Sequence, residues 1–277
     1  MSPVQPGLPM AALGASLARE SRETMRAGLL FPVASTAVGN RAVLNILGML
    51  DPEQPTSADR YRSPVVLVHG YGGNRSHWLA LQLRLRRAGF TNVEAFSYNP
   101  MTMSLGGIAR ALVRTCHDAM EAAGSDHLHL AGHSLGGIVV RYAVQQLGLA
   151  ADVRTAVTVA TPHRGTPVAF LGCGPVAWAL RPGSPILRAL TGVDCPPDVT
   201  WVAYYSDHDL IVRPDSAQLD ERRLRAVNVL IPGAGHLGIL RSPLFLRSAV
   251  RLLVAGEQGP AGAPVAAPGP ASPSVAA

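Results

Sequence analysis

A serine with small neighbours stands in the sequence GHSLG at residues 132–136. Densely apolar stretches lie on both sides, between residues 128 and 144, and they indicate a buried strand that runs directly into a buried helix. So tight a turn strains the serine backbone and needs neighbours without a Cβ atom, so that the hydroxyl projects at the carboxyl end of the strand. The pattern predicts that Ser134 is a nucleophile and that the adjacent His133 is a packing residue.

A serine hydroxyl is a weak nucleophile, so it needs a base within hydrogen-bond reach and an acid that orients the base. In a strand–serine–helix turn these groups follow in the order serine, acid, histidine. The histidines after the serine are His163, His208 and His236. His236 lies among glycines just after one predicted strand, and Asp207 and Asp209 come just after another. His236 is therefore the expected base, while the spacing leaves both aspartates open as the acid.

Two backbone N–H groups are expected to stabilise the oxyanion of a tetrahedral intermediate. One belongs to Leu135, directly after the nucleophile. The other belongs to Tyr71 in the loop VHGYGGN, residues 68–74, whose glycines let the backbone bend inward. A phosphate-binding loop is the alternative interpretation, but the Lys and Ser or Thr that complete such a motif are missing.

Six short apolar runs alternate with helical runs and supply the elements that must position these groups. We predict strands at residues 63–70, 91–99, 127–132, 153–162, 200–206 and 225–233, and helices at residues 76–90, 104–124 and 136–148. Consecutive strands carry no hairpin signal between them. The alternation therefore predicts an α/β fold with a mostly parallel central sheet and helices on both faces.

The chain divides into three parts by composition. Residues 1–60 are expected to form a helical segment, residues 61–256 a catalytic domain, and residues 257–277, rich in Pro, Gly and Ala, a disordered tail. Inside the domain, the apolar stretch from His163 to Asp198 is a candidate wall or lid of an acyl pocket, with an ordinary core-packing excursion as the equal alternative. Its candidate substrate-binding residues are Phe170, Trp178 and Leu180.

The charge composition argues against a nucleic-acid partner. All 24 basic residues are arginines, and with 18 acidic residues they give a net charge of +6 that is spread thinly over the 277 residues. The basic run LRLRR at residues 83–87 follows Gln82 and carries no aromatic residue on which a base could stack. A solvated helix face is the better interpretation of that run.

Cysteine usage and the amino terminus bear on the compartment. The cysteines are Cys116, Cys173 and Cys195, and no C-x-x-C pair suggests zinc or redox chemistry. The amino terminus lacks the features of a signal peptide, and no apolar run reaches the about 20 residues of a membrane span. These features favour a cytoplasmic or peripheral-membrane location, whereas a disulfide between Cys173 and Cys195 would indicate export.

Four sequence blocks together resemble the α/β-hydrolase lipases, and more narrowly the small bacterial class 2 lipases. The blocks VVLVHGYGGN, AGHSLGG, YSDHDLIV and GHLGIL occur in that group's order, within about residues 64–253. The resemblance implies the α/β-hydrolase fold, the nucleophile Ser134, the acid Asp209 rather than Asp207, and the base His236. It also implies Tyr71 and Leu135 as the oxyanion donors, and neither a metal nor an organic cofactor.

One stretch departs from the smallest members of that group. ATPHRGTP, at residues 160–167, resembles a segment of acyl-ester hydrolases with a larger cap. We expect a lipase that acts on triacylglycerol or other hydrophobic acyl esters, with the ester and a lipid interface as its partners. A short-chain carboxylesterase or an acyltransferase would use the same groups, and a non-catalytic binding protein on a hydrolase fold is the alternative of another class. The oligomeric state stays open.

Overall fold

The computed structural model describes residues 61–193 and 198–258. The helical segment expected over residues 1–60 and most of the tail expected over residues 257–277 lie outside the described residues. Cys195 lies outside them as well, so the optional disulfide between Cys173 and Cys195 is not among the described contacts. Among the residues that are described, no helix is both long and apolar enough to cross a membrane.

Six strands form one sheet in which every neighbouring pair is parallel. The strands are β1 (Val65–Val68), β2 (Val93–Phe96), β3 (Leu128–His133), β4 (Val153–Val159), β5 (Thr200–Tyr205) and β6 (Val227–Leu230). Their order is β2-β1-β3-β4-β5-β6, so the winding of the chain reverses between β1 and β3. In open parallel sheets, ligands bind at the carboxyl ends of the strands beside such a reversal. The expected parallel sheet is confirmed, and Ser134 directly follows β3.

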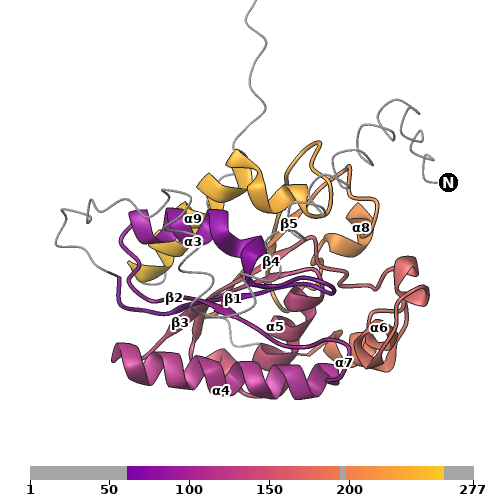
Figure 1. The fold of residues 1–277 in the computed structure, drawn as a ribbon, viewed down its shortest axis with the longest axis horizontal. Helices are drawn as coiled ribbons and strands as arrows, with labels where there is room; N and C mark the ends of the chain where they lie inside the picture. The colour runs from indigo at the N-terminus through magenta and orange to yellow at the C-terminus, as the bar shows by residue number, and fades with distance from the viewer. Residues whose placement is uncertain (1–60, 194–197, 259–277) are drawn as a thin grey trace, which may run out of the picture.

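Helices cover both faces of the sheet (Figure 1). Helices α4 (Leu105–Ala123) and α5 (Leu135–Gln146) pack on one face, and α3 (Leu79–Arg87) and α9 (Pro243–Glu257) pack on the other. Every residue of β1 and β3 is buried. Because strands that are covered on both sides expose no polar face, they appear in the sequence as continuous apolar runs rather than as alternating patterns.

Local residues set the ends of α4 close to the expected range of 104–124. The Ser104 side chain accepts a hydrogen bond from the Gly107 N–H at 3.2 Å and so satisfies one of the free donors of the first turn. At the other end, Gly124 adopts a left-handed conformation with φ at +60°, which a glycine adopts without steric cost. The long helix against α5 is therefore delimited by its own sequence.

The stretch between β4 and β5 folds into short helices, and we call residues 163–193 the cap segment. Its helices are the 3-10 helix η3 (Pro167–Phe170), α6 (Pro175–Ala179) and α7 (Pro185–Leu190). Each helix has a proline in its first turn, where the missing N–H costs no hydrogen bond. The other short elements are the 3-10 helices η1 (Arg75–Trp78), η2 (Leu149–Ala151) and η4 (Gly238–Arg241), and helix α8 (Pro214–Ala217).

Candidate active site

Ser134 occupies the turn between β3 and α5 with φ at +52° and ψ at −121°, a region that non-glycine residues rarely adopt. Neighbouring glycines make the turn sterically feasible. A Cβ atom on Gly132 would lie 2.5 Å from the backbone of Gly136, and one on Gly136 would lie 2.2 Å from the carbonyl oxygen of Val68. Backbone strain of this kind costs about 1–3 kcal/mol, and the close packing of β1, β3 and α5 holds it in place.

His236 and Asp209 form a buried hydrogen-bonded pair. The Nδ1 atom of His236 donates to a carboxylate oxygen of Asp209 at 2.8 Å. The other carboxylate oxygen accepts hydrogen bonds from the N–H groups of Ile211 and Val212, at 2.8 and 2.9 Å. These bonds fix the carboxylate, which in turn keeps the proton of the imidazole on Nδ1 and leaves Nε2 to act as a base.

The other candidate acid and bases have different partners. Asp207 accepts hydrogen bonds from the Gly233 N–H at 2.8 Å and from the ring of His208 at 2.9 Å. His163 is buried against Thr158, to which its Nε2 lies at 3.1 Å, and burial lowers its pKa well below the usual value. Of the two aspartates that the spacing left open, the structure brings Asp209 to His236.

A cavity of about 560 Å³ joins these groups at the carboxyl end of the sheet. Ser134, His236 and Tyr71 all line it, and so does Leu180 of the cap segment. Most of the other lining residues are apolar or small: Gly72, Thr166, Val168, Ala169, Leu171, Gly172, Ala177, Ile211 and Leu237. Asn74, His77 and His133 are the polar ones. The stretch predicted as a pocket wall therefore does line the same cavity as Ser134, mainly through η3, the turn after it and Ala177 of α6.

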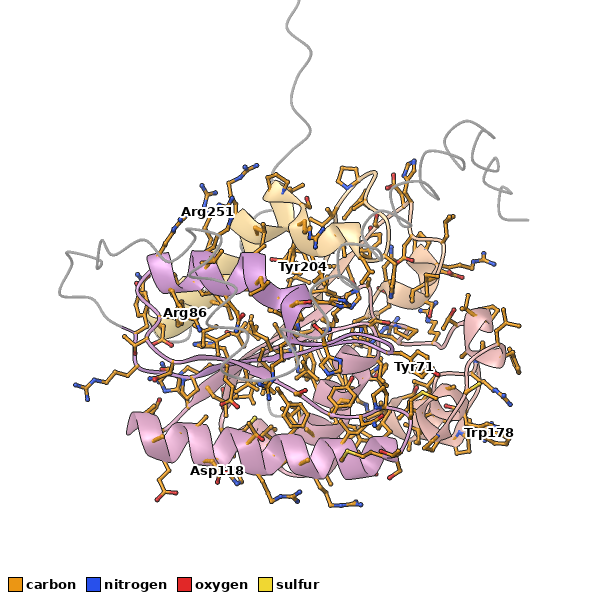
Figure 2. The ribbon with its side chains drawn as sticks, viewed as in Figure 1. Tyr71, Arg86, Asp118, Trp178, Tyr204 and Arg251 are labelled. Atoms are coloured by element: carbon orange, nitrogen blue, oxygen red, sulfur yellow. The ribbon has the colours of Figure 1, made fainter. Side chains whose placement is uncertain are left out.

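Phe170 and Trp178 do not line this cavity, although the sequence suggested both as pocket residues. Their side chains are 59% and 64% exposed, and the guanidinium of Arg181 lies over both rings, at 5.0 and 5.1 Å from the ring centroids. Figure 2 shows Trp178 at the outer rim of the molecule, outward of Tyr71. The short helices of the cap segment turn these two rings away from the site while Leu180 turns inward.

The two expected oxyanion donors border the nucleophile. The Leu135 N–H belongs to the first turn of α5, where backbone donors have no partner within the helix. Among the described residues, neither this N–H nor that of Tyr71 donates a hydrogen bond. The Tyr71 side chain holds its loop against the cap segment, because its hydroxyl donates to the Cys173 carbonyl at 2.7 Å and accepts from the Cys173 N–H at 3.1 Å.

Two histidines at the cavity had no assigned role from the sequence. His133, expected only to pack, donates from Nε2 to the backbone carbonyl of His236 at 3.0 Å and thus holds the loop that carries the base. His77 lies beside it, with ring centroids 6.3 Å apart. Burial, followed by the neighbouring His69 and His236, lowers the pKa of His77 to about 4. The residue before the nucleophile was the available signal for His133, whereas nothing in its local pattern marked His77.

Comparisons with known proteins find similarity over part of the chain. The family model described as "Putative serine esterase (DUF676)" matches residues 63–175, which include Ser134 but neither Asp209 nor His236. A triacylglycerol lipase of Burkholderia plantarii is 32% identical over 124 residues, which make up 40% of this chain and 33% of that protein. The chain thus matches only about a third of that relative.

Solved structures extend the likeness to the fold. A lipase of Bacillus licheniformis matches with a TM-score of 0.61 at 16% identity, covering 73% of this chain and 96% of that one. Lipase B of Aspergillus fumigatus also has a TM-score of 0.61, at 17% identity, and covers 81% of this chain and 58% of that one. The all-parallel sheet and these matches show that the chain has the fold of the α/β-hydrolase lipases and esterases.

Proposed function

We propose that this protein is a serine ester hydrolase that cleaves triacylglycerols or other hydrophobic acyl esters. The observation that carries the proposal is the grouping of a serine in a strained turn with a hydrogen-bonded histidine–aspartate pair around one mostly apolar cavity. The match to a serine esterase family and the relative described as a triacylglycerol lipase support it.

In the acylation step, Nε2 of His236 removes the proton of Ser134 Oγ as that oxygen attacks the ester carbonyl carbon. The carbonyl oxygen becomes an oxyanion, which the N–H groups of Leu135 and Tyr71 stabilise. Asp209 orients the imidazole and stabilises the positive charge that it gains. The tetrahedral intermediate then collapses, the alcohol leaves with the proton from His236, and the acyl group stays on Ser134.

Water completes the cycle in the deacylation step. His236 removes a proton from a water molecule, whose oxygen attacks the acyl carbon of the acyl-enzyme. The same two N–H groups stabilise the second oxyanion. When the intermediate collapses, Ser134 Oγ leaves with the proton from His236 and the carboxylic acid is released. Each half of the reaction uses one histidine in turn as base and acid.

The surroundings of the cavity favour a hydrophobic acyl group. Val168, Leu180 and Leu237 are among its lining residues. The cap segment also exposes Leu171, on the cavity wall, at 85% of its surface and Trp178, outside the cavity, at 64%. Apolar side chains gathered in this way, with a nearby arginine, are suited to a lipid interface. We propose that the cap segment faces the lipid when the ester enters.

Hydrolysis of p-nitrophenyl esters from acetate to palmitate tests the proposal. We expect the native protein to prefer long acyl chains and Ser134→Ala to lower kcat by about 10⁴–10⁶-fold. Ser248→Ala is the matched control, because Ser248 contacts Tyr204 on the opposite face of the sheet. A fluorophosphonate probe should label the native protein and the control but not Ser134→Ala.

Two outcomes would change the assignment. Turnover of short esters alone would indicate a carboxylesterase and remove the lipid from the proposal. If Ser134→Ala matches the native protein in turnover and labelling, Ser134 is not the nucleophile. Absence of labelling in folded native protein would favour the non-catalytic alternative.

A further inference from the structure

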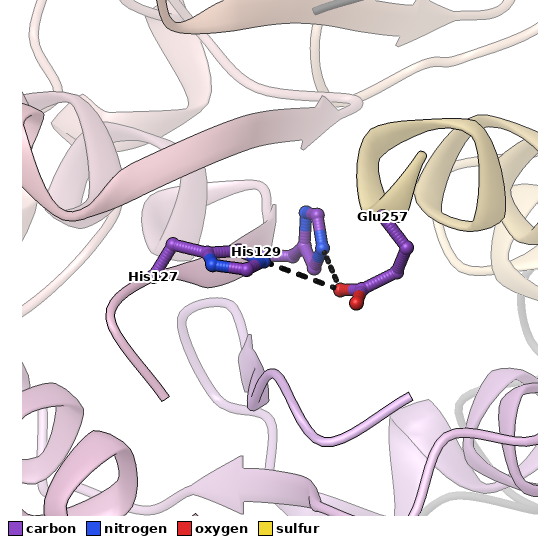
Figure 3. A group of neighbouring side chains, drawn as sticks. All are labelled: His127, His129 and Glu257. Carbon is purple, nitrogen blue, oxygen red and sulfur yellow. Dashed lines mark hydrogen bonds and ion pairs between the residues drawn. The ribbon is translucent and has the colours of Figure 1, made fainter. Parts of the chain in front are cut away.

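A second group of side chains that could bind a ligand lies at the amino end of β3, whereas Ser134 follows its carboxyl end. His127 precedes β3, His129 is its second residue, and Glu257 is the last residue of α9 (Figure 3). At about 3.3 Å per residue along a strand, His129 lies some 16 Å from the nucleophile. Within residues 61–193 and 198–258, this is the one group of three potential metal ligands whose ligand atoms all lie within 4.8 Å of one another.

Glu257 is held between both imidazoles. One carboxylate oxygen lies 2.7 Å from Nε2 of His129 and 3.7 Å from Nε2 of His127. The other oxygen accepts a hydrogen bond from the Ser63 hydroxyl at 3.0 Å. The side chains of His129, Glu257 and His127 are 0%, 10% and 15% exposed. The three ligand atoms therefore converge in a largely buried space that solvent can still reach beside His127.

The outer nitrogen of His127 is already oriented as in a metal site. Nδ1 lies 2.5 Å from a carboxylate oxygen of Asp126, to which it donates. Metal-bound histidines commonly donate their second ring N–H to a carboxylate in this way. With the proton on Nδ1, Nε2 of His127 carries a lone pair and lies 2.7 Å from the Ser63 hydroxyl, which also lies 3.0 Å from the second Glu257 oxygen. In a zinc site the Ser63 hydroxyl would keep its bond to Glu257, and Nε2 would turn its lone pair to the cation instead.

A missing side chain makes room for His129. Gly256 lies in α9, where glycine costs about 1 kcal/mol relative to alanine. A Cβ atom there would lie 2.8 Å from Cε1 of His129 and 2.6 Å from Oγ1 of Thr155. On its other side the ring meets Phe90 edge to face, with centroids 6.1 Å apart. Packing therefore fixes the imidazole beside Glu257.

We propose that His127, His129 and Glu257 bind a zinc ion that ties α9 to β3. Two imidazoles and one carboxylate are a recurrent zinc ligand set, whereas calcium and magnesium prefer oxygen ligands. Bonds of about 2.1 Å in a tetrahedral site would separate neighbouring ligand atoms by about 3.4 Å. The observed separations of 2.7 and 3.7 Å lie on either side of this value, so small side-chain shifts suffice. Water fills the fourth position, and the proposal does not depend on the ester hydrolase activity.

Zinc binding to the purified full chain tests the site. After dialysis against zinc and then zinc-free buffer, elemental analysis should find one zinc per native chain, and its thermal unfolding temperature should exceed that of the chelated protein. Titration calorimetry should show an affinity lowered more than about 100-fold in His127→Gln and Glu257→Gln, and about tenfold in Asp126→Asn. His117→Gln, which removes a surface histidine that pairs with Asp152, should bind zinc like the native chain.

Circular dichroism confirms that each variant is folded before zinc is added, and zinc X-ray absorption should report imidazole nitrogen neighbours. The proposal is overturned if the folded native chain retains no zinc. It is equally overturned if Glu257→Gln binds zinc as tightly as the native chain, because the ion would then lie elsewhere. In either case the three side chains only hold α9 against β3 by hydrogen bonds.

Discussion

Strand β3 has a histidine–carboxylate pair at each of its ends. At the carboxyl end, beside Ser134, Nδ1 of His236 lies 2.8 Å from Asp209. At the amino end, Nε2 of His129 lies 2.7 Å from Glu257. Both pairs join distant parts of the chain, 27 and 128 residues apart, and both are largely buried. The pairs are almost identical in composition and distance, yet we assign them different chemistry.

Their surroundings account for the difference. Asp209 is fixed by two backbone N–H groups, and its histidine opens on a cavity that also holds a serine. Glu257 instead meets a second imidazole and a serine hydroxyl that is itself engaged in hydrogen bonds, and the cavity beside Ser134 does not reach it. A histidine–carboxylate pair by itself therefore indicates no function. Access for a substrate and the presence of a strained nucleophile decide what the pair can do.

Removing one carboxylate charge at each end should separate the two roles. In Asp209→Asn the amide no longer holds the correct tautomer of His236, so kcat for ester hydrolysis should fall about 10⁴-fold. In Glu257→Gln, near the amino end of β3, kcat should stay within about twofold of the native value. Steady-state kinetics at saturating ester, with thermal unfolding of each variant, provide the measurement. Equal losses of kcat in both folded variants would refute the separation of roles.

Adding one methyl group at each end should also give unequal effects on the free energy of unfolding. The Cβ of Gly136→Ala would meet the carbonyl oxygen of Val68 at 2.2 Å, and strand backbone cannot move aside. The free energy of unfolding of Gly136→Ala should therefore be about 3 kcal/mol lower than that of the native chain. Gly256→Ala meets side-chain atoms of Thr155 and His129 rather than strand backbone, so its steric cost is smaller, and it gains about 1 kcal/mol of helix propensity.

Urea unfolding of both variants measures this difference. We expect Gly256→Ala to unfold within about 1 kcal/mol of the native chain. Its zinc affinity should nevertheless fall, because the new methyl group displaces the ring of His129. A larger loss of stability in Gly256→Ala than in Gly136→Ala would mean that the amino end of the sheet is the more rigid of the two.

Much of the fold and the centre of the site could be predicted from local sequence. Apolar runs that alternate with helical runs indicate a parallel sheet covered on both faces, which the structure confirms. The turn at Ser134 was predictable because glycines at fixed offsets answer a steric need that is local to the turn. Tyr71, Leu135 and His236 were placed by their positions after predicted elements. The structure gathers Tyr71 and His236 around one cavity with Ser134, and Leu135 directly follows Ser134 as the first residue of α5.

Contacts that depend on tertiary packing could not be predicted in this way. Spacing did not separate Asp207 from Asp209, because both follow β5 and only the path of the loop decides which reaches His236. Phe170 and Trp178 face solvent. Their orientation could not be predicted, because the short helices of the cap segment have no sustained apolar period that would identify an inner face. Glu257 seemed to begin a tail, whereas it ends α9 against a histidine 128 residues earlier.

The smallest expected effect is a change in how the free energy of unfolding depends on pH, and it comes from His77 near the carboxyl end of the sheet. His77 lines the cavity, its Nδ1 has no hydrogen-bond partner among the described residues, and burial is the main cause that lowers its pKa to about 4. Its value in the unfolded chain is about 6.5. Between these values the unfolded chain binds the proton and the folded chain does not, so the stability contributed by the neutral ring is lost as the pH falls below about 6.5.

Replacing His77 by glutamine should remove this dependence. Between pH 7 and pH 5 the native chain should lose about 2 kcal/mol more unfolding free energy than His77→Gln, as followed by urea unfolding at each pH. His117→Gln is the control, because the His117 side chain is 56% exposed and lies outside the cavity. The other buried histidines remain in all three proteins and cancel in the comparison. Parallel pH curves for the native chain and His77→Gln would show that the folded protein admits a proton to this ring, and that the catalytic end of the sheet is more open to water than its packing indicates.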